Sequence, residues 1–264
     1  MVGSWGSAKW FAPFSRSRLT GESCRYGRLT LFYQVESNRP SENARQYTDG
    51  MELDPQYLVR DTAELRALYG QPRERSLRKQ MDHLDEYSRA FIAASPFVIL
   101  STQGAGSIGD PDGLADCSPR GDAPGFVKVV DDRTLLLPDR RGNNRLDGLL
   151  NVLVNPRIGL LFLIPGINES FRVNGIAQIS RDPALTAQFV VQEKTPNTVL
   201  VIHVQEAYVH CSRALLRASL WDPAKFARPG AVPSFGTIMA AHTRGLVDAQ
   251  TVDEEYRTRM PALY

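Results

Sequence analysis

Apolar residues recur in short runs through the middle of the chain. Each run has the length and the β-branched or aromatic content of a strand. The expected strands are Phe97–Thr102, Leu114–Ser118, Phe126–Val130, Thr134–Leu137, Arg157–Ile164, Ser170–Ile179 and Val199–Cys211. Most connections between them are too short for the crossovers that parallel strands need, so we expect antiparallel pairing in one closed barrel. With helices beside the barrel, the pattern predicts an α+β fold.

Helical spacing appears on both sides of the strand region. Asp61 and Glu64 form a capping-box pattern ahead of a short helix that is expected to end near Gly70. A longer helix is expected over Glu74–Ala94, because apolar side chains recur there at helical intervals and Pro96 then forces extended structure. Shorter helices are expected at Pro183–Gln192, Ser212–Trp221 and Thr237–His242.

A helix is also predicted directly after residues 140–145. Its apolar side chains recur at intervals of three, four and seven residues, which predicts one buried face. These side chains are Leu146, Leu149, Leu150 and Leu153. Asn143 or Asn144 is expected to cap the first turn, where free N–H groups attract phosphate oxygens.

The pattern divides the chain into four segments. The first fifty residues show no sustained period and contain no acidic residue before Glu22. They are expected to be disordered, or to be upstream sequence translated ahead of a natural start at Met51. The remaining segments are expected to be N-terminal helices at 51–95, the barrel at 96–222 and a C-terminal helical tail at 223–264.

Composition and charge narrow the class of protein. Of 264 residues, 42% are hydrophobic, which suits a soluble protein with a sizeable core. The first fifty residues hold seven basic and four acidic side chains (+3) and the remainder 24 and 25 (−1), which gives the net charge of +2, so a basic nucleic-acid surface is not indicated. No apolar run approaches the roughly 18 residues of a spanning helix, so no membrane partner is expected. Three cysteines without CxxC spacing favour a reducing compartment, and the cytoplasm is expected.

Two basic segments form the candidate anion site. Residues 140–145 place three arginines and Gly142 between a predicted strand and a predicted helix. Guanidinium groups pair with phosphate through two parallel hydrogen bonds, and glycine lets the backbone approach a ligand closely. Ser118–Asp122 carries Arg120 between two other predicted strands. In a single barrel the two segments could converge on one anion, and the alternative is a solvated arginine cluster that binds nothing.

Three further patterns argue against a dinucleotide site, a metal site and a thiol nucleophile. Gly104–Gly109 matches the dinucleotide pattern GxGxxG, but a second turn follows where a helix should begin, so we expect a hairpin loop. The four histidines form no HxH or HxxxH pair, and no metal site is expected. Cys117 lies beside Ser118 and near Arg120 without a neighbouring histidine, which disfavours a thiol nucleophile.

The segment from Leu135 to Phe162 resembles a known flavoprotein family. The run LLLPDRRGNNR, then LLN and NPRIGLLF, is similar to the flavin-binding segment of pyridoxamine 5'-phosphate oxidase-like proteins, which are FMN-binding split barrels. In that family a strand leads into a basic turn that grips the FMN phosphate, and a helix and an Asn-Pro-Arg turn follow. The resemblance covers Phe97–Ser180 well and extends loosely to Trp221, where Leu220–Pro223 is similar to a predicted flavin-nucleotide-binding subgroup. It implies an antiparallel split β-barrel with flanking helices.

The resemblance also implies which side chains hold the FMN phosphate. Arg120, Asn144 and Arg145 are implied to contact it. Arg140 and Arg141 are implied to be their neighbours, and the sequence does not separate the roles of these two. The most direct expectation is a phosphate contact from Arg145.

Further roles concern the ring system and the partner chain. Ser118, Phe126 and Val127 are implied to border the isoalloxazine ring or the ribityl chain. The family implies a homodimer with flavin at the subunit interface, and Trp221 is a candidate for the residue that the partner contributes.

The implied function is that of an FMN-binding oxidoreductase that passes hydride or electrons between flavin and a small substrate. The sequence names neither that substrate nor the electron donor or acceptor. Flavin supplies the redox chemistry, so no side chain is assigned as a catalytic acid or base. Two alternatives stay open: a non-enzymatic module that holds flavin, deazaflavin or haem, and a true pyridoxamine 5'-phosphate oxidase. The paired C-terminal Arg and His that hold pyridoxal phosphate in the true oxidases are not found, which argues against the last.

Overall fold

The computed structural model describes residues 53–104 and 113–259, and the chain divides into two compact units, Met1–Gln71 and Pro72–Tyr264. Two predictions fall outside the described residues. They are the character of residues 1–50 and the hairpin loop expected at 104–109, of which only Gly104 is described. Within the described ranges, no helix has both the length and the hydropathy needed to cross a bilayer.

The described part of the first unit holds a 3₁₀ helix, η2 (Pro55–Tyr57), and helix α1 (Thr62–Tyr69). Asp61 caps α1 as predicted, accepting a hydrogen bond from the Glu64 N–H at 2.8 Å. The Glu64 carboxylate accepts the N–H of Arg60 at 2.9 Å, one residue earlier than a capping box requires. The helix ends at Gly70, whose positive φ of 72° suits glycine.

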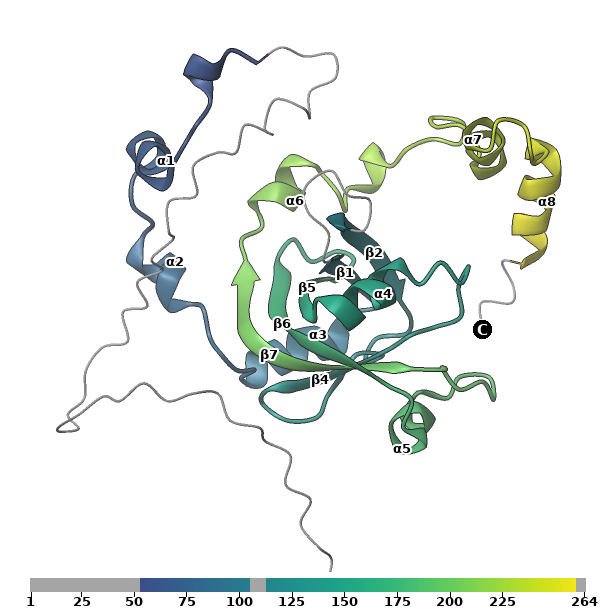
Figure 1. Ribbon diagram of the computed structural model, residues 1–264, viewed down its shortest axis with the longest axis horizontal. Helices are drawn as coiled ribbons and strands as arrows, with labels where there is room; N and C mark the ends of the chain where they lie inside the picture. Colours follow the sequence, from purple (N-terminus) through teal and green to yellow (C-terminus); the bar gives the residue numbers. More distant parts are fainter. Residues whose placement is uncertain (1–52, 105–112, 260–264) are drawn as a thin grey trace, which may run out of the picture. The chain divides into compact units, whose positions relative to one another are not determined.

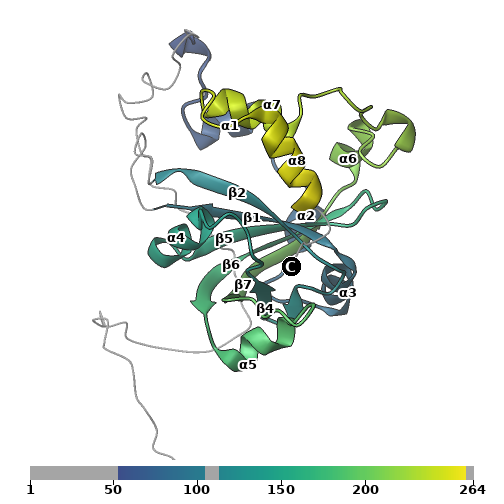
Figure 2. The same cartoon turned by 90° about the vertical axis from the view of Figure 1, so that its right-hand side faces the viewer.

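The second unit is built on one antiparallel sheet of seven strands in the order β2-β1-β5-β6-β7-β4-β3 (Figure 1). The strands are β1 (Phe97–Gln103), β2 (Ala115–Gly121), β3 (Lys128–Val129), β4 (Thr134–Pro138), β5 (Arg157–Leu163), β6 (Ser170–Ser180) and β7 (Val199–His210). The sheet curls around its core, with helices beside it (Figure 2). This confirms the predicted α+β class and the antiparallel pairing, and it leaves β2 and β3 as the two edges of the sheet.

Alternation along the strands places one face of the sheet in the core. On β1 and β5 every second residue is buried, which is the period of a strand with one covered face. Phe162 has an exposed fraction of 0% and lies in the same hydrophobic cluster as Leu160 and Val204. Pro119 lies in β2, where an edge strand tolerates a residue without an N–H. Arg120 is therefore held on a strand, not on a loop.

Helix α4 (Asp147–Val154) packs with a different face from the one predicted. Leu149 and Val152 are buried, whereas Leu150 and Leu153 are 56% and 70% exposed. The buried face of α4 consists of Gly148, Leu149 and Val152, and Gly148 faces Thr102 of β1, whose Oγ1 would lie 3.5 Å from an added Cβ. The buried face therefore includes Gly148 and Val152, whereas the predicted Leu150 and Leu153 lie outside it.

The predicted long helix over Glu74–Ala94 is wrong, because the chain forms two helices, α2 (Glu74–Arg78) and α3 (Glu86–Ala94). Between them, Met81 pairs with Ala207 of β7 through two backbone hydrogen bonds of 3.0 and 2.8 Å. This pairing requires extended backbone and interrupts the helix. Asp85 then caps α3 by accepting the N–H of Ser88 at 2.8 Å.

The remaining helices are shorter or more numerous than predicted. The segment at 183–192 is only α5 (Pro183–Thr186) and the 3₁₀ turn η4 (Ala187–Phe189), and the segment at 212–221 is α6 (Arg213–Arg217), followed by the 3₁₀ turn η5 (Pro223–Lys225). Helix α7 (Phe235–His242) agrees with its prediction within two residues. Helix α8 (Ala249–Arg259) was not predicted, because it is polar and lacks apolar periodicity. It packs on α7 at Gly236, whose N–H donates to Asp253 at 2.7 Å.

Candidate functional site

Two ion pairs cross between β2 and the residues that follow β4. Arg120 Nη1 lies 2.6 Å from Asp139 Oδ1, and Arg140 Nη2 lies 2.7 Å from Asp122 Oδ2. In the first pair the arginine lies on β2 and the aspartate follows β4. In the second pair the arginine follows β4 and the aspartate follows β2. Strand β3 pairs only with Leu135 and Leu136, so the end of β4 is not covered by it. We call the line between β2 and the end of β4 the seam.

The seam pairs are largely shielded from water. The Arg120 and Asp139 side chains are 22% and 18% exposed, and those of Arg140 and Asp122 are 20% and 3% exposed. Arg140 also donates from Nη1 to the carbonyl oxygen of Phe189 at 2.6 Å. Partly buried, hydrogen-bonded arginines hold their positions better than exposed ones do, so the two seam guanidinium groups are held in place in advance.

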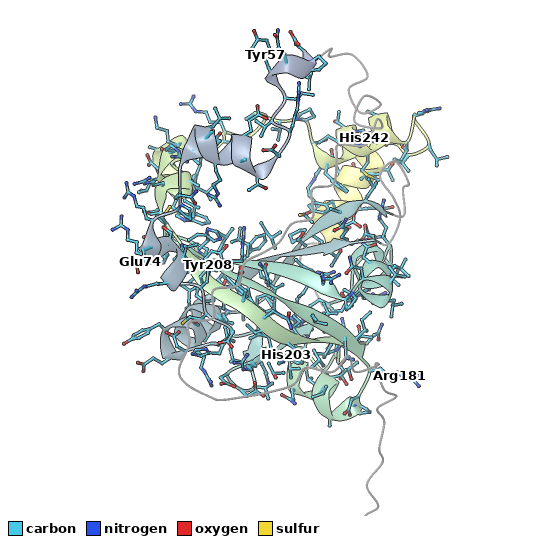
Figure 3. The ribbon with its side chains drawn as sticks, turned by 60° about the vertical axis from the view of Figure 1, so that its left-hand side comes forward. Tyr57, Glu74, Arg181, His203, Tyr208 and His242 are labelled. Carbon is cyan, nitrogen blue, oxygen red and sulfur yellow. The ribbon has the colours of Figure 1, made fainter. Side chains whose placement is uncertain are left out.

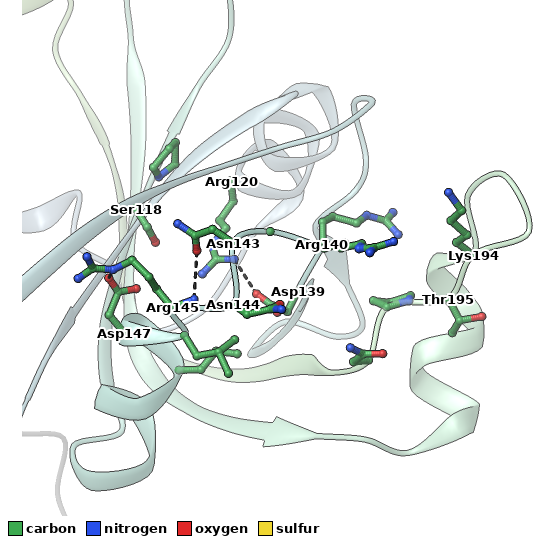
Figure 4. Close-up of a pocket in the computed structure, with 17 residues that line it drawn as sticks. Ser118, Arg120, Asp139, Arg140, Asn143, Asn144, Arg145, Asp147, Lys194 and Thr195 are labelled. Carbon is green, nitrogen blue, oxygen red and sulfur yellow. Dashed lines mark hydrogen bonds and ion pairs between the residues drawn. The ribbon is translucent and has the colours of Figure 1, made fainter. Parts of the chain in front are cut away.

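A hollow of about 740 Å³ opens at the seam, a volume within the range of small-molecule sites (Figure 4). Its described lining carries five cationic side chains, Arg120, Arg140, Arg141, Arg145 and Lys194, and two carboxylates, Asp139 and Asp147. Ser118, Thr195, Asn143, Asn144 and Asn197 add polar groups to this lining. The two basic segments that the sequence singled out therefore converge on one cavity with an excess of positive charge.

The turn that enters α4 is built differently from the sequence prediction. No side chain caps α4, so the expected capping by Asn143 or Asn144 is wrong. Asn143 instead accepts the N–H of Arg145 at 3.1 Å and so shapes the turn, while Asn144 has a positive φ of 61°. Arg145 lies 3.3 Å from Asp147 and its side chain is 74% exposed, so it is free to swing toward a ligand.

One buried hydrogen-bond donor at the seam has no acceptor, which bears on whether a phosphate fits this cavity. Arg120 Nε is buried and has no hydrogen-bond partner in the described structure, since the guanidinium meets Asp139 through Nη1. An unpaired buried donor costs about 1–3 kcal/mol, which an acceptor that reaches it would recover. Phosphate oxygens are such acceptors, and guanidinium forks suit them. The residues present therefore fit a phosphate-bearing ligand.

Of the remaining predicted site residues, two line a hollow and two do not. Ser118 lines the 740 Å³ hollow. Phe126 is 7% exposed and borders an adjoining hollow of about 520 Å³. Val127 is 2% exposed and lies in the hydrophobic core, outside both described linings. Trp221 also lies outside both, and its indole N–H donates to the Ile167 carbonyl oxygen at 2.8 Å.

Sequence reasoning missed one wall of the hollow, formed by Lys194, Thr195, Pro196 and Asn197. These residues precede β7, whose Val199 pairs with Pro138 at the end of β4. The Asp139 N–H also donates to the Thr198 carbonyl oxygen at 3.0 Å. Only the β4–β7 pairing brings this loop to the arginines, and no local motif marks it. Asp139 was missed as well, although it lies directly before Arg140.

A second basic cluster lies outside the hollow, around Tyr208 of β7, which is labelled in Figure 3. Lys79 Nζ and the Arg172 guanidinium carbon lie 5.0 and 5.5 Å from the ring centre of Tyr208, and the His210 ring centre lies 5.0 Å from the same ring. Burial lowers the pKa of His210 below its ordinary value, and the charges of Arg172 and Lys79 lower it further. No described group of three or more His, Cys, Asp or Glu side chains could hold a metal ion.

We expect His210 to titrate below the ordinary histidine pKa in an NMR titration of the folded protein. Lys79→Met should raise this pKa only part of the way back, because burial is the larger cause. A folded pKa below the unfolded one means that the unfolded chain binds the proton more readily, so lowering the pH below about 6.5 reduces stability. A His210 pKa at or above the ordinary value would contradict this assignment.

An antiparallel sheet curled into a barrel, with an open seam, defines a split-barrel protein, and arginines line a cavity along that seam. Residues 84–211 match the family model described as pyridoxamine 5'-phosphate oxidase. This part of the chain belongs to the pyridoxamine 5'-phosphate oxidase-like FMN-binding split-barrel family.

Solved structures with a similar fold come from several bacteria. HupZ from Group A Streptococcus is 19% identical, with a TM-score of 0.37 over 47% of this chain and 91% of that one. An FMN-binding protein from Syntrophomonas wolfei is 12% identical, with a TM-score of 0.36 over 47% and 83% of the two chains. A protein of the pyridoxinephosphate oxidase family from Clostridium acetobutylicum, related to general stress protein 26, is 14% identical, with a TM-score of 0.34 over 47% and 85%. A search of curated proteins finds no match.

Proposed function

We propose that this chain binds FMN, with the flavin phosphate held at the seam by Arg120, Arg145 and Asn144. The observation that carries the proposal is the convergence of Arg120 and the 140–145 turn on one hollow, together with the unpartnered Nε of Arg120. Arg140 is held by Asp122 and Phe189, which suits a supporting role beside the phosphate. The family to which residues 84–211 belong supports a flavin as the ligand.

The absorption spectrum of the purified protein tests this proposal. We expect flavin bands, and a released chromophore that is FMN. Arg145→Ala should weaken FMN binding about tenfold, or about 1.4 kcal/mol, because it removes one phosphate contact from an exposed and unstrained position. Arg217→Ala on α6, outside the described lining, is the matched control and should leave binding unchanged. A colourless protein that also fails to take up added FMN would refute the proposal.

The proposed activity is that of an oxidoreductase acting on a small substrate. Bound flavin would supply hydride or electron transfer, while the chain binds and orients it. Multiple turnovers of NADH or NADPH oxidation with an artificial electron acceptor would support an enzyme. A holoprotein that never turns over would support a storage or sensing module. Hydrogen peroxide release on adding pyridoxine phosphate would instead indicate a true pyridoxamine 5'-phosphate oxidase.

We also propose that the chain is a homodimer with the flavin at the subunit interface. The supporting observation is the exposed apolar face of α4, which begins at the hollow with Leu146 and continues through Leu150, Leu153 and Val154. These side chains are between 48% and 70% exposed, an unusual amount of apolar surface beside a charged cavity. Trp221 is the proposed contribution from the partner. We also propose a cytoplasmic location, on the ground that the sequence has three cysteines without CxxC spacing.

Leu153→Glu should convert the dimer to a monomer, because a carboxylate at the centre of an apolar interface loses its hydration without gaining a partner. Light scattering coupled to gel filtration measures the change in mass. Leu216→Glu on α6, at a comparably exposed leucine, is the control and should leave the mass unchanged. A wild-type protein that is monomeric with flavin bound would contradict the interface.

A further inference from the structure

A carboxylate lines the cavity where the proposed phosphate would bind. Asp139 accepts a hydrogen bond from Arg120 Nη1 at 2.6 Å, and both side chains are mostly shielded from water. From its charge alone, Asp139 is expected to weaken the binding of an anion, because it repels the anion and neutralises one of the arginines. The geometry of the pair indicates a different role.

The bond to Asp139 leaves the rest of the Arg120 guanidinium with a defined direction. Guanidinium is a rigid planar fork, so fixing Nη1 fixes the directions of Nε and Nη2 as well. Nε is buried and unpartnered, so the donor left over by the pair is one that only a ligand or a rearrangement can satisfy. A donor set held in advance binds more tightly than a flexible one, because less motion is lost on binding.

The second seam pair steadies the segment that carries Asp139. Arg140, the next residue, donates from Nε to Asp122 at 2.8 Å and from Nη1 to the Phe189 carbonyl oxygen, and its Nη2 lies 2.7 Å from the same aspartate. The Asp139 backbone N–H is held by Thr198. Asp139 is therefore anchored through its own backbone and through its neighbour, which is what a residue needs if it is to orient another side chain.

We propose that Asp139 is a positioning residue, which orients Arg120 toward the phosphate of the ligand. The inference rests on the proposed function, in that the ligand carries a phosphate group. If Asp139 has this role, removing its negative charge weakens the binding of the phosphate, although electrostatic repulsion alone predicts that binding would become tighter.

Asp147 provides a matched control for this consequence. It lines the same hollow and also pairs with an arginine, Arg145, at 3.3 Å. That arginine is 74% exposed, so Asp147 does not hold it in a fixed direction. Asp139→Asn and Asp147→Asn thus remove the same charge from one cavity, and only the first removes a positioning contact.

The test measures the affinities of wild type and both variants for FMN and for riboflavin, which lacks the phosphate. Asp139→Asn should weaken FMN binding about tenfold, equivalent to about 1.4 kcal/mol, and should leave riboflavin binding within about twofold of wild type. Asp147→Asn should make FMN binding up to about threefold tighter, by the loss of one repulsion and of the pair with Arg145. If Asp139→Asn binds FMN as tightly as wild type or more tightly, the positioning role is overturned.

A double-mutant cycle covers the case in which Asp139→Asn folds poorly. Arg120→Lys keeps the charge but lacks the planar fork, so Asp139 has no fork to orient in this background. Adding Asp139→Asn to Arg120→Lys should then change FMN affinity by less than about twofold. A tenfold loss in both backgrounds would show that Asp139 acts independently of Arg120, contrary to the proposal.

Inorganic pyrophosphate separates this inference from the proposed function. If the wild type binds neither FMN nor riboflavin, the flavin proposal fails. The positioning role is then measured by thermal stabilisation with pyrophosphate, which should appear in wild type and Asp147→Asn and be much smaller in Asp139→Asn. Equal stabilisation of all three proteins, or none in wild type, would overturn it.

Discussion

Replacing Arg120 with alanine is expected to weaken FMN binding by between tenfold and a hundredfold. The substitution removes the only buried guanidinium donor left unpartnered in the described structure, and it leaves the Asp139 carboxylate in the cavity without its cation. A charge-assisted hydrogen bond contributes about 1.5–3 kcal/mol, which corresponds to that range of affinity. Titration of the apoprotein with FMN, followed by flavin fluorescence, measures the change.

Arg133→Ala is the control for this result. Arg133 also forms an ion pair with an aspartate, Asp82, at 2.7 Å, but lies outside the described lining of the hollow. Its removal should leave FMN affinity within about twofold of wild type, since the pair is solvent-exposed and contributes little. If the two variants lose affinity equally, the loss comes from general destabilisation and not from a phosphate contact.

Phe162→Ala is expected to lower the free energy of unfolding by about 3–5 kcal/mol, the range measured for large-to-small changes of buried aromatic residues. Phe162 is 0% exposed and lies on β5, a strand near the middle of the sheet. The cavity left behind would be surrounded by strands that are paired on both sides, and these can collapse little. Urea unfolding followed by circular dichroism measures the change.

Phe226→Ala makes the same chemical change at a side chain that is 58% exposed, after the 3₁₀ turn η5 (Pro223–Lys225). It should alter the free energy of unfolding by no more than about 0.5 kcal/mol. A Phe162→Ala protein as stable as Phe226→Ala would mean that β5 does not lie in the core.

Strand positions could be predicted from the sequence because alternation of buried and exposed residues is a local signal. Arg157–Ile164 was predicted and β5 covers Arg157–Leu163, since buried apolar residues occupy every second position there. Helix α7 was also predicted within two residues, and its N-terminal cap is local, because Ser234 Oγ accepts the N–H of Thr237 at 3.1 Å. In such elements the residues that set the structure lie next to one another in the chain.

The errors arose where distant residues decide the structure. Helical periodicity over 74–94 is genuine, yet Met81 pairs with Ala207, more than a hundred residues away, and this breaks the helix. The face of α4 was predicted from leucine spacing, while the buried face that packs near Thr102 of β1 contains Gly148, Leu149 and Val152. Spacing along one helix carries no information about such a contact.

The candidate site divides in the same way. Arg120 and Arg145 were predicted to share a site because their residue types suit phosphate and a family resemblance linked their segments. The structure places both on one hollow. Lys194 and Asn197 were not predicted, because only the pairing of Pro138 with Val199 brings their loop to the seam. Asp139 was overlooked because a carboxylate has no obvious use in an anion site until its geometry with Arg120 is known.

The most direct test of the central claim is a calorimetric comparison of FMN and riboflavin binding to the wild-type apoprotein. The two ligands share the isoalloxazine ring and ribityl chain and differ only in the phosphate. If the seam arginines hold that phosphate, FMN should bind at least a hundredfold more tightly, equivalent to about 2.8 kcal/mol. Equal affinities would show that the arginines at the seam do not bind the flavin phosphate and would contradict the account.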